Sequence, residues 1–394
     1  MLNDHEAFES GDSFLEHFLP GSSASIRQLR GVIYRLNIRH KKHRMVPSVL
    51  LLGERGVGKG YVAHVIAAHL EWLRESKGLE VKPVDEADVY QIARGAGLRG
   101  QTLTALPESL AAVALFGARK GAYTDLKEDR LGLFDSSPKA RSGAGTPDPF
   151  DAFLDEIGDA PPGIQAGLLE VLETRTFRPL GSSFEESART TDARIICATN
   201  RDLQSMVATN EFRADLYDRL NWMRITLPPL REQTDQLRVI IKRANAALCN
   251  KYKIEDAAPS ELDITWAQGY SWPGNYRELV QVLWMWHLYR PELSLREVVE
   301  VRAKAIRRPS GSMEGTITER VFQELDSILS GKRDGYKTYG EIGHDIQRLT
   351  YAAVYKYNKE HGLKNEELEK LFTGQKPTNV RKQISQNRPK AEKQ

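Results

Sequence analysis

The sequence Gly53-Glu-Arg-Gly-Val-Gly-Lys-Gly60 decides the expected fold. It follows an apolar run at 49–52, which predicts a buried strand, and precedes a helical pattern at 61–70. A glycine-rich turn between a strand and a helix N-terminus binds anions, because its backbone N–H groups and the helix dipole point at the loop. Lys59 adds a point charge for the terminal phosphates. We therefore predict a nucleoside triphosphate site at this turn.

One position departs from the usual phosphate-loop pattern. Ser or Thr normally follows the lysine and its hydroxyl binds magnesium, whereas this chain has Gly60. The residues expected to contact ATP in this segment are consecutive: Gly53, Glu54, Arg55, Gly56, Val57, Gly58, Lys59, Gly60 and Tyr61.

The composition is that of a soluble globular protein, with 40% hydrophobic and 28% charged residues in a chain of 394. No apolar run approaches the ~20 residues that cross a bilayer, and the N-terminus lacks a signal-peptide pattern. Cys197 and Cys249 lie far apart without metal-binding spacing, so we expect two reduced, buried thiols in a cytoplasmic protein. The net charge is only +3, so nucleic-acid affinity has to come from local clustering.

Apolar runs that alternate with helical patterns up to about residue 230 predict an α/β fold with a parallel sheet covered by helices. The strand-like runs are 49–52, 150–154, 195–198 and 223–227. Two stretches, around 75–94 and at 136–149, have the appearance of insertions. The expected divisions are a leader at 1–20, an α/β subdomain at 21–232, a small helical subdomain at 233–307, a linker at 308–316 and a C-terminal helical domain at 317–394.

A second motif strengthens the prediction of a triphosphate site. The apolar segment Phe153-Leu154 ends in Asp155 and Glu156, about 100 residues after the loop. Asp155 would hold the magnesium ion that bridges the β- and γ-phosphates, and Glu156 would polarise the attacking water. The alternative is an exposed acidic pair that closes a strand.

Polar residues further along fit the same chemistry. Asn200 ends the apolar run that begins at Ile195, from where it would reach the γ-phosphate or the water. Arg213 and Arg219 are six residues apart, which fits an oligomer in which one subunit supplies cations to its neighbour's γ-phosphate. The alternative for each arginine is a surface salt bridge.

The segment 272–279, WPGNYREL, predicts the start of a helix in the small subdomain. Pro273 and Gly274 make the turn, and we expect Asn275 to cap the helix. Arg277 lies in the first turn, where the helix dipole disfavours a cation, which suggests a phosphate partner.

Together these segments resemble the AAA+ domain of sigma-54-dependent transcription activators, the bacterial enhancer-binding proteins, over roughly residues 20–290. The matching segments are GERGVGKG (53–60), ALFGARKGAYTDL (114–126), FLDEIGD (153–159), FRPLGS (177–182), ATNRDL (198–203), FRADLYDRLN (212–221), LPPLRE (227–232) and WPGNYREL (272–279). The resemblance implies an AAA+ P-loop ATPase, with 21–232 as the α/β subdomain and 233–307 as the helical lid. It also implies a homo-oligomeric ring of six subunits.

The resemblance also assigns roles to the candidate residues. It implies that the loop around Lys59 binds ATP, that Asp155 holds Mg²⁺, and that Glu156 activates water. It makes Asn200 the first sensor, and it makes Arg277 the second. Arg213 and Arg219 become the arginine fingers supplied in trans. In this family the residue after the lysine is usually not Ser or Thr, which implies that magnesium is held mainly by Asp155 and water.

Two departures from the family pattern affect the expected partner and signalling. The loop that contacts sigma-54 RNA polymerase reads GAFTGA or GAYTGA in the family, whereas here it consists of Gly121, Ala122, Tyr123, Thr124, Asp125 and Leu126. Aspartate adds a charge and blocks the close backbone approach that glycine permits. The family also has an upstream asparagine that restrains the catalytic glutamate, and the corresponding region, 92–106, has none. Arg94 or Thr102 falls there instead.

The two ends of the chain carry separate expectations. Only about 20 residues precede the α/β subdomain, so we expect control by a partner in trans or by expression. At the C-terminus, a short helix at 365–372, a turn and a basic helix from Pro377 have the layout of a helix-turn-helix that binds DNA. The alternative is a basic tail on a helical packing module. The residues expected to face DNA are Asn379, Arg381, Lys382, Gln383 and Arg388.

Two functions follow from these features. The first is a ring-forming, ATP-hydrolysing transcription regulator that remodels a promoter-bound polymerase and is tethered to DNA by its C-terminus. The second is a repurposed AAA+ switch, in a defence or mobile-element system, that acts on a partner other than sigma-54. Asp125 and Leu126 motivate the second.

Overall fold

The computed structural model describes residues 12–21, 23–43, 48–75, 86–104, 106–123, 126–135, 150–183, 185–252, 257–290 and 293–307. The chain divides into two compact units, Met1–Pro229 and Leu230–Gln394. The predicted linker and C-terminal domain, with every residue expected to contact DNA, lie outside the described residues. None of the described helices is long and apolar enough to span a membrane.

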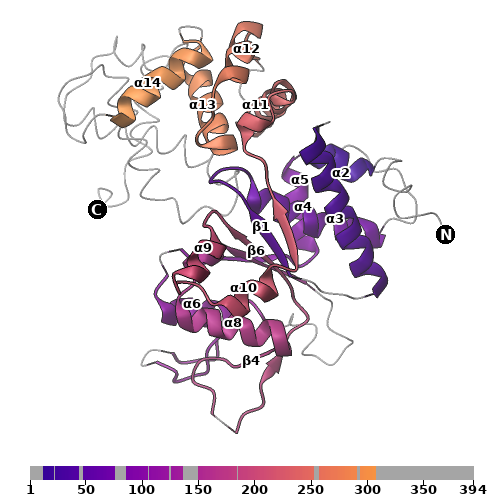
Figure 1. Ribbon diagram of the computed structural model, residues 1–394, viewed down its shortest axis with the longest axis vertical. Helices are drawn as coiled ribbons and strands as arrows, with labels where there is room; N and C mark the ends of the chain where they lie inside the picture. Colours follow the sequence, from indigo (N-terminus) through magenta and orange to yellow (C-terminus); the bar gives the residue numbers. More distant parts are fainter. Residues whose placement is uncertain are drawn as a thin grey trace. The chain divides into compact units, whose positions relative to one another are not determined.

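The first unit is built on a five-stranded parallel sheet, which confirms the predicted α/β fold (Figure 1). The strand order is β2-β3-β6-β1-β7. The strands are β1 (Val49–Leu52), β2 (Arg99–Thr102), β3 (Asp151–Asp155), β6 (Arg194–Thr199) and β7 (Met223–Thr226). Four of the five match apolar runs in the sequence. The edge strand β2 was not predicted, because its sequence RGQT is polar throughout.

Helices cover both faces of the sheet (Figure 1). Neighbouring residues of β1 point to opposite faces, so Val49 and Leu51 enter one core and Leu50 the other. The first core packs against α2 (Ser13–Phe18), α3 (Ala24–His43), α4 (Lys59–Glu75) and α5 (Glu86–Gly95). The second packs against α6 (Glu108–Phe116), α8 (Pro162–Thr174), α9 (Leu203–Ala208) and α10 (Ala214–Leu220).

The expected leader at 1–20 contains part of the first core. Helix α2 begins after Asp12, whose carboxylate accepts a hydrogen bond from the Leu15 backbone N–H at 2.9 Å. Its side chains Phe14, Leu15 and Phe18 are buried. These three apolar residues lie on one face of a single helical turn, and their burial against α3 and α4 stabilises a helix too short to persist alone. Likewise, the expected insertion at 75–94 contains most of α5, which packs on α4.

A buried ion pair joins two strands of the sheet to helix α3. Arg194 in β6 is fully buried and donates to both carboxylate oxygens of Asp151 in β3, at 2.6 and 2.8 Å. Its third contact is the amide oxygen of Asn37 at 2.6 Å. The charge therefore has partners on three sides, as burial of an arginine requires.

The second unit is helical among its described residues, as predicted. It contains the 3₁₀ turn η2 (Leu230–Glu232) and α11 (Leu237–Tyr252), α12 (Glu261–Gly269), α13 (Asn275–Tyr289) and α14 (Leu295–Arg307). The prediction that Asn275 caps α13 is wrong. Gly274 occupies the N-cap position, and the buried Asn275 amide accepts a hydrogen bond from the Leu230 N–H at 2.8 Å. This bond satisfies a backbone group that would otherwise be buried without a partner.

Both cysteines of the chain are free and buried, as predicted. Cys197 lies in the central strand β6, where burial raises the pKa of its thiol far above the ordinary value. Its thiol is therefore inert at neutral pH.

The buried pair Asp151–Arg194 generates a stability prediction. Asp151→Ala leaves the guanidinium of Arg194 without its bidentate partner, and we expect a loss of about 3–5 kcal/mol in the free energy of unfolding, measured by urea denaturation. The double variant Asp151→Ala/Arg194→Met removes the charge as well and should recover most of that loss. Equal stability of the wild-type protein and Asp151→Ala would contradict this account.

Candidate active site

The predicted phosphate-binding loop joins β1 to α4. Three of its glycines have positive φ angles: Gly53 at 153°, Gly56 at 79° and Gly58 at 90°. Gly53 also has no room for a side chain, because a Cβ atom there would lie 3.0 Å from Val57 Cγ2 and 3.1 Å from the Leu227 carbonyl oxygen. Glycine is required at this position for both reasons.

Lys59 is the first residue of α4 and lies across the loop. Its ammonium group donates to the carbonyl oxygens of Gly53 at 2.9 Å and Glu54 at 3.2 Å, and the residue is only 7% exposed. These bonds hold a fixed positive charge at the helix N-terminus, where the dipole also favours an anion.

Gly60 occupies an open position on α4. A Cβ atom there would meet only Phe153 Cε1, at 3.9 Å, which is an ordinary van der Waals distance. Glycine is therefore not required by packing at Gly60, and the chain supplies no hydroxyl there for a metal. The His64 ring nitrogen Nδ1 lies 2.7 Å from the Gly60 carbonyl oxygen. Burial lowers the pKa of His64, which keeps the ring neutral at pH 7.

Asp155 and Glu156 lie at the carboxyl end of β3. Asp155 is the last residue of the strand and pairs in register with Thr102 of β2 and Ala198 of β6. Glu156 has φ 54° and ψ 52°, a left-handed conformation that is uncommon for a glutamate and turns the chain sharply after the strand. Its carboxylate oxygen Oε2 accepts a hydrogen bond from the Asn200 N–H at 3.3 Å.

The residues present fit a magnesium ion that is held partly by the nucleotide. Among the residues that the structure describes, no three His, Cys, Asp or Glu side chains converge as a complete metal site. Magnesium in nucleotide enzymes is typically bound by one or two carboxylates together with substrate phosphates and water. Asp155 supplies one such carboxylate next to the loop.

The parallel sheet brings these separated segments to one edge. Strand β6 lies between β1 and β3, so Asn200, which follows β6, lies between the phosphate loop and Glu156. Ligands bind at the carboxyl edge of such sheets. The structure thus places Lys59, Asp155, Glu156 and Asn200 together, although the role of each remains a prediction.

Arg213 and Arg219 are both exposed, on or next to helix α10. Arg213 is the N-cap residue, its side chain is 48% exposed, and its Nη2 atom lies 2.7 Å from Asp215 Oδ2. This hydrogen bond raises the pKa of Arg213 and lowers that of Asp215. Arg219 is 53% exposed and pairs with Glu173 at 3.1 Å. In the single chain, both arginines therefore form surface salt bridges, which was the alternative to the finger role. Such exposed pairs are weak enough to exchange for another anion.

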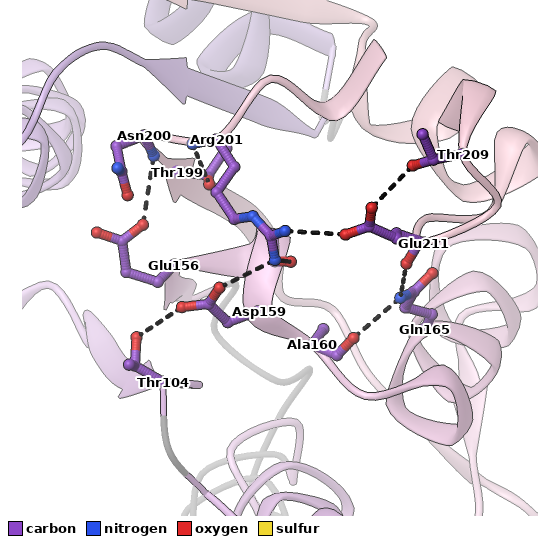
Figure 2. A network of polar contacts seen from close by, with 11 residues as sticks. Thr104, Glu156, Asp159, Ala160, Gln165, Thr199, Asn200, Arg201, Thr209 and Glu211 are labelled. Carbon is purple, nitrogen blue, oxygen red and sulfur yellow. Dashed lines mark hydrogen bonds and ion pairs between the residues drawn. The ribbon is translucent and has the colours of Figure 1, made fainter. Parts of the chain in front are cut away.

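Arg201 is a site residue that the sequence reasoning missed. Its guanidinium donates to the Gly158 carbonyl at 3.0 Å. It also pairs with Asp159 at 3.3 Å and with Glu211 at 3.0 Å (Figure 2). The signal was its place directly after Asn200 in the ATNRDL segment.

Arg94 and Thr102 are the two residues expected in the region where the family has an upstream asparagine. Thr102 lies opposite Asp155 in the β2–β3 register, and Arg94 is exposed at the end of α5. The Thr104 hydroxyl donates to Asp159 at 3.1 Å, and the Glu156 carboxylate accepts from the Asn200 N–H (Figure 2).

The predicted partner loop packs against Gly181, where a Cβ atom would lie 2.7 Å from Ala122 Cβ. Ala118 bridges to Leu180, and Arg119 makes ion pairs with Asp129 and Glu186. Gly121, Ala122, Tyr123 and Leu126 are described, whereas Thr124 and Asp125 lie outside the described residues. The Gly121 N–H donates to the Leu126 carbonyl at 3.0 Å, which closes the loop at its base. Tyr123 is 39% exposed, so its ring is accessible to a partner.

Arg277 belongs to the second unit, where it is exposed in the first turn of α13. The acidic residue next to it, Glu278, is buried and accepts hydrogen bonds from the Gly274 N–H, the Tyr270 hydroxyl and Arg302. The sensor role of Arg277 stays a prediction.

Comparisons with known proteins identify relatives. The family model described as "Sigma-54 interaction domain" matches residues 21–226. The formate hydrogenlyase transcriptional activator FhlA of Escherichia coli (strain K12) is 32% identical over 303 residues, which are 74% of this chain and 39% of that protein. Regulatory protein AtoC of the same organism is 37% identical over 238 residues, 60% of this chain and 44% of that protein. The chain spans less than half the length of both relatives.

A solved structure supports the fold assignment. NtrX from Brucella abortus in complex with ATP has a TM-score of 0.54 and 18% sequence identity, and the match covers 93% of this chain and 69% of that chain. At this identity the similarity shows the fold.

The contrast between Gly53 and Gly60 yields a matched pair of variants. Gly53→Ala forces a strained φ and a clash with Val57 and Leu227, so we expect the affinity for ATP to fall at least tenfold in equilibrium binding of a fluorescent ATP analogue. Gly60→Ala fits a helical position with open space, and should bind the analogue as the wild-type protein does. Equal affinities of the two variants would refute the role assigned to the loop.

Proposed function

The chain belongs to the sigma-54 interaction domain family, and on that basis we propose that it is an ATP-hydrolysing, ring-forming AAA+ transcription regulator. The observation that carries the proposal is the shared carboxyl edge of β1, β3 and β6, where the phosphate loop, Asp155, Glu156 and Asn200 meet. These are the groups that phosphoryl transfer from ATP to water requires.

We propose one task for each group at this edge. The loop N–H groups and Lys59 would bind the phosphates. Asp155 would hold Mg²⁺, which would supply positive charge to the phosphates during transfer. Glu156 accepts a proton from the attacking water. Asn200, which holds the Glu156 carboxylate through its backbone, presents its side-chain amide to the γ-phosphate or the water.

Arg213 and Arg219 complete the site of a neighbouring subunit. Both are exposed and paired with carboxylates at the surface, and a transferring γ-phosphate would compete for the same guanidinium groups. An arginine supplied in trans needs an adjacent subunit at each ATP site, which a ring provides. The family resemblance suggests a ring of six subunits. Arginines supplied in trans raise hydrolysis by ~10³–10⁵-fold in comparable enzymes.

The energy of hydrolysis would be used on a protein partner. We propose that the loop of residues 121–126, with Tyr123 accessible at its surface, contacts sigma-54 in a promoter-bound polymerase. FhlA and its relatives are described as transcriptional activators. DNA tethering through the C-terminal basic helix, with Asn379, Arg381, Lys382, Gln383 and Arg388, is proposed from the sequence alone.

A second function rests on Asp125 and Leu126, which replace the final Gly-Ala of the family loop. In this alternative the same ATPase acts on a partner other than sigma-54, in a defence or mobile-element system. The ATP site is common to both functions, so only the partner distinguishes them.

Glu156→Gln tests the hydrolytic role. The amide cannot accept a proton, so we expect steady-state hydrolysis to fall by roughly 10²–10⁴-fold while the dissociation constant for ATP stays within about twofold. Glu300→Gln, an exposed carboxylate paired with Arg296 in the second unit, serves as the control and should hydrolyse ATP normally. Undiminished turnover by Glu156→Gln would refute the assignment.

The partner is tested by binding and by promoter opening. With ATP or a transition-state analogue, the purified protein should bind sigma-54 and open a sigma-54 promoter complex. Because Tyr123 is the exposed aromatic residue of the loop, Tyr123→Ala should lose both activities yet retain ATP hydrolysis. No binding by the wild-type protein while it turns over ATP would remove the activator function and leave the repurposed switch.

A further inference from the structure

A network of polar contacts runs from Glu156 to Glu211, which lies two residues before Arg213 (Figure 2). It begins at Glu156, whose carboxylate accepts from the Asn200 N–H at 3.3 Å. The next residue, Arg201, follows strand β6. Its side chain contacts two other segments, the turn at Gly158 and the segment at Glu211. Its backbone N–H is fixed by the Thr199 hydroxyl at 3.0 Å.

Arg201 holds the turn that follows Glu156. It donates to the Gly158 carbonyl at 3.0 Å and pairs with Asp159 at 3.3 Å. The aliphatic part of the Arg201 side chain packs directly on Gly158. A Cβ atom on Gly158 would lie 3.1 Å from Arg201 Cβ and 3.2 Å from Arg201 Cδ. A movement of Glu156 or Asn200 therefore moves the anchor of this guanidinium.

The other side of the guanidinium holds the segment before α10. Arg201 Nη2 lies 3.0 Å from Glu211 Oε2, and the Thr209 hydroxyl donates to the other oxygen of the same carboxylate at 2.9 Å. Glu211 is two residues before Arg213. The Glu211 carboxylate therefore fixes the short connection from α9 to the candidate finger.

A buried amide ties the same two segments together. Gln165 in α8 is 2% exposed and donates to the Ala160 carbonyl at 2.9 Å and the Glu211 carbonyl at 3.2 Å. Its amide oxygen accepts from the Arg213 N–H at 2.9 Å. The backbone of Arg213 is thus held from the core, while the Arg201–Glu211 pair holds the connection from the surface side.

We propose that Arg201 and Glu211 are positioning residues that set the place of Arg213 according to the state of the ATP site in the same subunit. The proposal rests on the proposed function, since it concerns an arginine finger that acts in trans. Arg213 would then reach the neighbour's γ-phosphate correctly only when Glu156 and Asn200 of its own subunit are in place. Successive sites in the ring are coupled by this link.

Because the pair is exposed, its role in positioning can be separated from a role in stability. The Arg201 and Glu211 side chains are 41% and 53% exposed, and exposed ion pairs add little to stability. Removing Glu211 should therefore leave the fold intact and affect the rate through geometry, where a displacement of about 1 Å costs up to about 100-fold.

Mixed rings separate the subunit that gives the finger from the subunit that hydrolyses. The acceptor subunit is Arg213→Ala/Arg219→Ala, which keeps its ATP site. The donor is Glu156→Gln, which keeps its arginines and an amide oxygen that accepts from the Asn200 N–H, so that the network to Arg213 stays intact. Each alone should be inactive and the mixture active, because hydrolysis then occurs where an acceptor site meets a donor finger. A mixture without activity would contradict the finger in trans and with it the proposed function.

Glu211→Ala is then added to the donor or to the acceptor. We expect roughly a 10-fold or greater fall in kcat of the active mixture when it is in the donor, and no change when it is in the acceptor. The dissociation constant for ATP should stay constant in both. An active mixture that loses nothing with Glu211→Ala in the donor, or that loses equally in both placements, overturns the inference while leaving the proposed function intact.

Two further variants exclude a general structural effect. Glu211→Gln retains an oxygen that accepts from Arg201, so it should lose less activity than Glu211→Ala in the donor. Glu261→Ala removes a comparable exposed pair, with Arg238 in the second unit, and should leave the mixture fully active. A thermal midpoint of Glu211→Ala well below that of Glu261→Ala, with a matching loss of activity in either placement, would assign the effect to folding and contradict the proposal.

Discussion

The parallel pairing of β3, β6 and β1 is the constraint on which the candidate site depends. Parallel strands end at the same edge, so residues far apart in the chain, such as Leu52 and Thr199, become neighbours. The register places Asp155 opposite Ala198, and Leu52 opposite Thr199. A shift of one residue would turn Asp155 to the other face of the sheet and separate it from the phosphate loop. The buried pair of Asp151 and Arg194 stabilises this register from the opposite end of the same two strands.

Much of the fold and of the expected ATP centre could be predicted from local signals. Apolar runs that end in Gly53, Asp155 or Asn200 indicated both the strands and their functional ends. Strand β2 escaped prediction because a polar edge strand has no hydrophobic pattern. Helix α2 escaped because three apolar residues in one turn do not distinguish a docked helix from a leader until their burial partners are known.

The polar network around Arg201 marks the limit of the sequence reasoning. Its members come from β6, from the turn after β3, from α8 and from the segment before α10, so no single window of sequence contains the pattern. Asn275 illustrates the same limit, because a residue with strong capping propensity is used instead for a long-range bond to the Leu230 N–H. Local propensity gives the available chemistry of a side chain, and tertiary packing decides which partner it takes.

The central claim is that the carboxyl edge of the sheet and the exposed arginines on α10 form one composite site between two subunits. The most direct measurement is a structure of the assembled protein with ADP and a metal-fluoride mimic of the transferred phosphoryl group. The account predicts the mimic between Lys59, Glu156 and Asn200 of one subunit, with Arg213 of the adjacent subunit in contact with it. A mimic bound away from these residues, or a ring in which no arginine of a neighbour reaches it, would contradict the account.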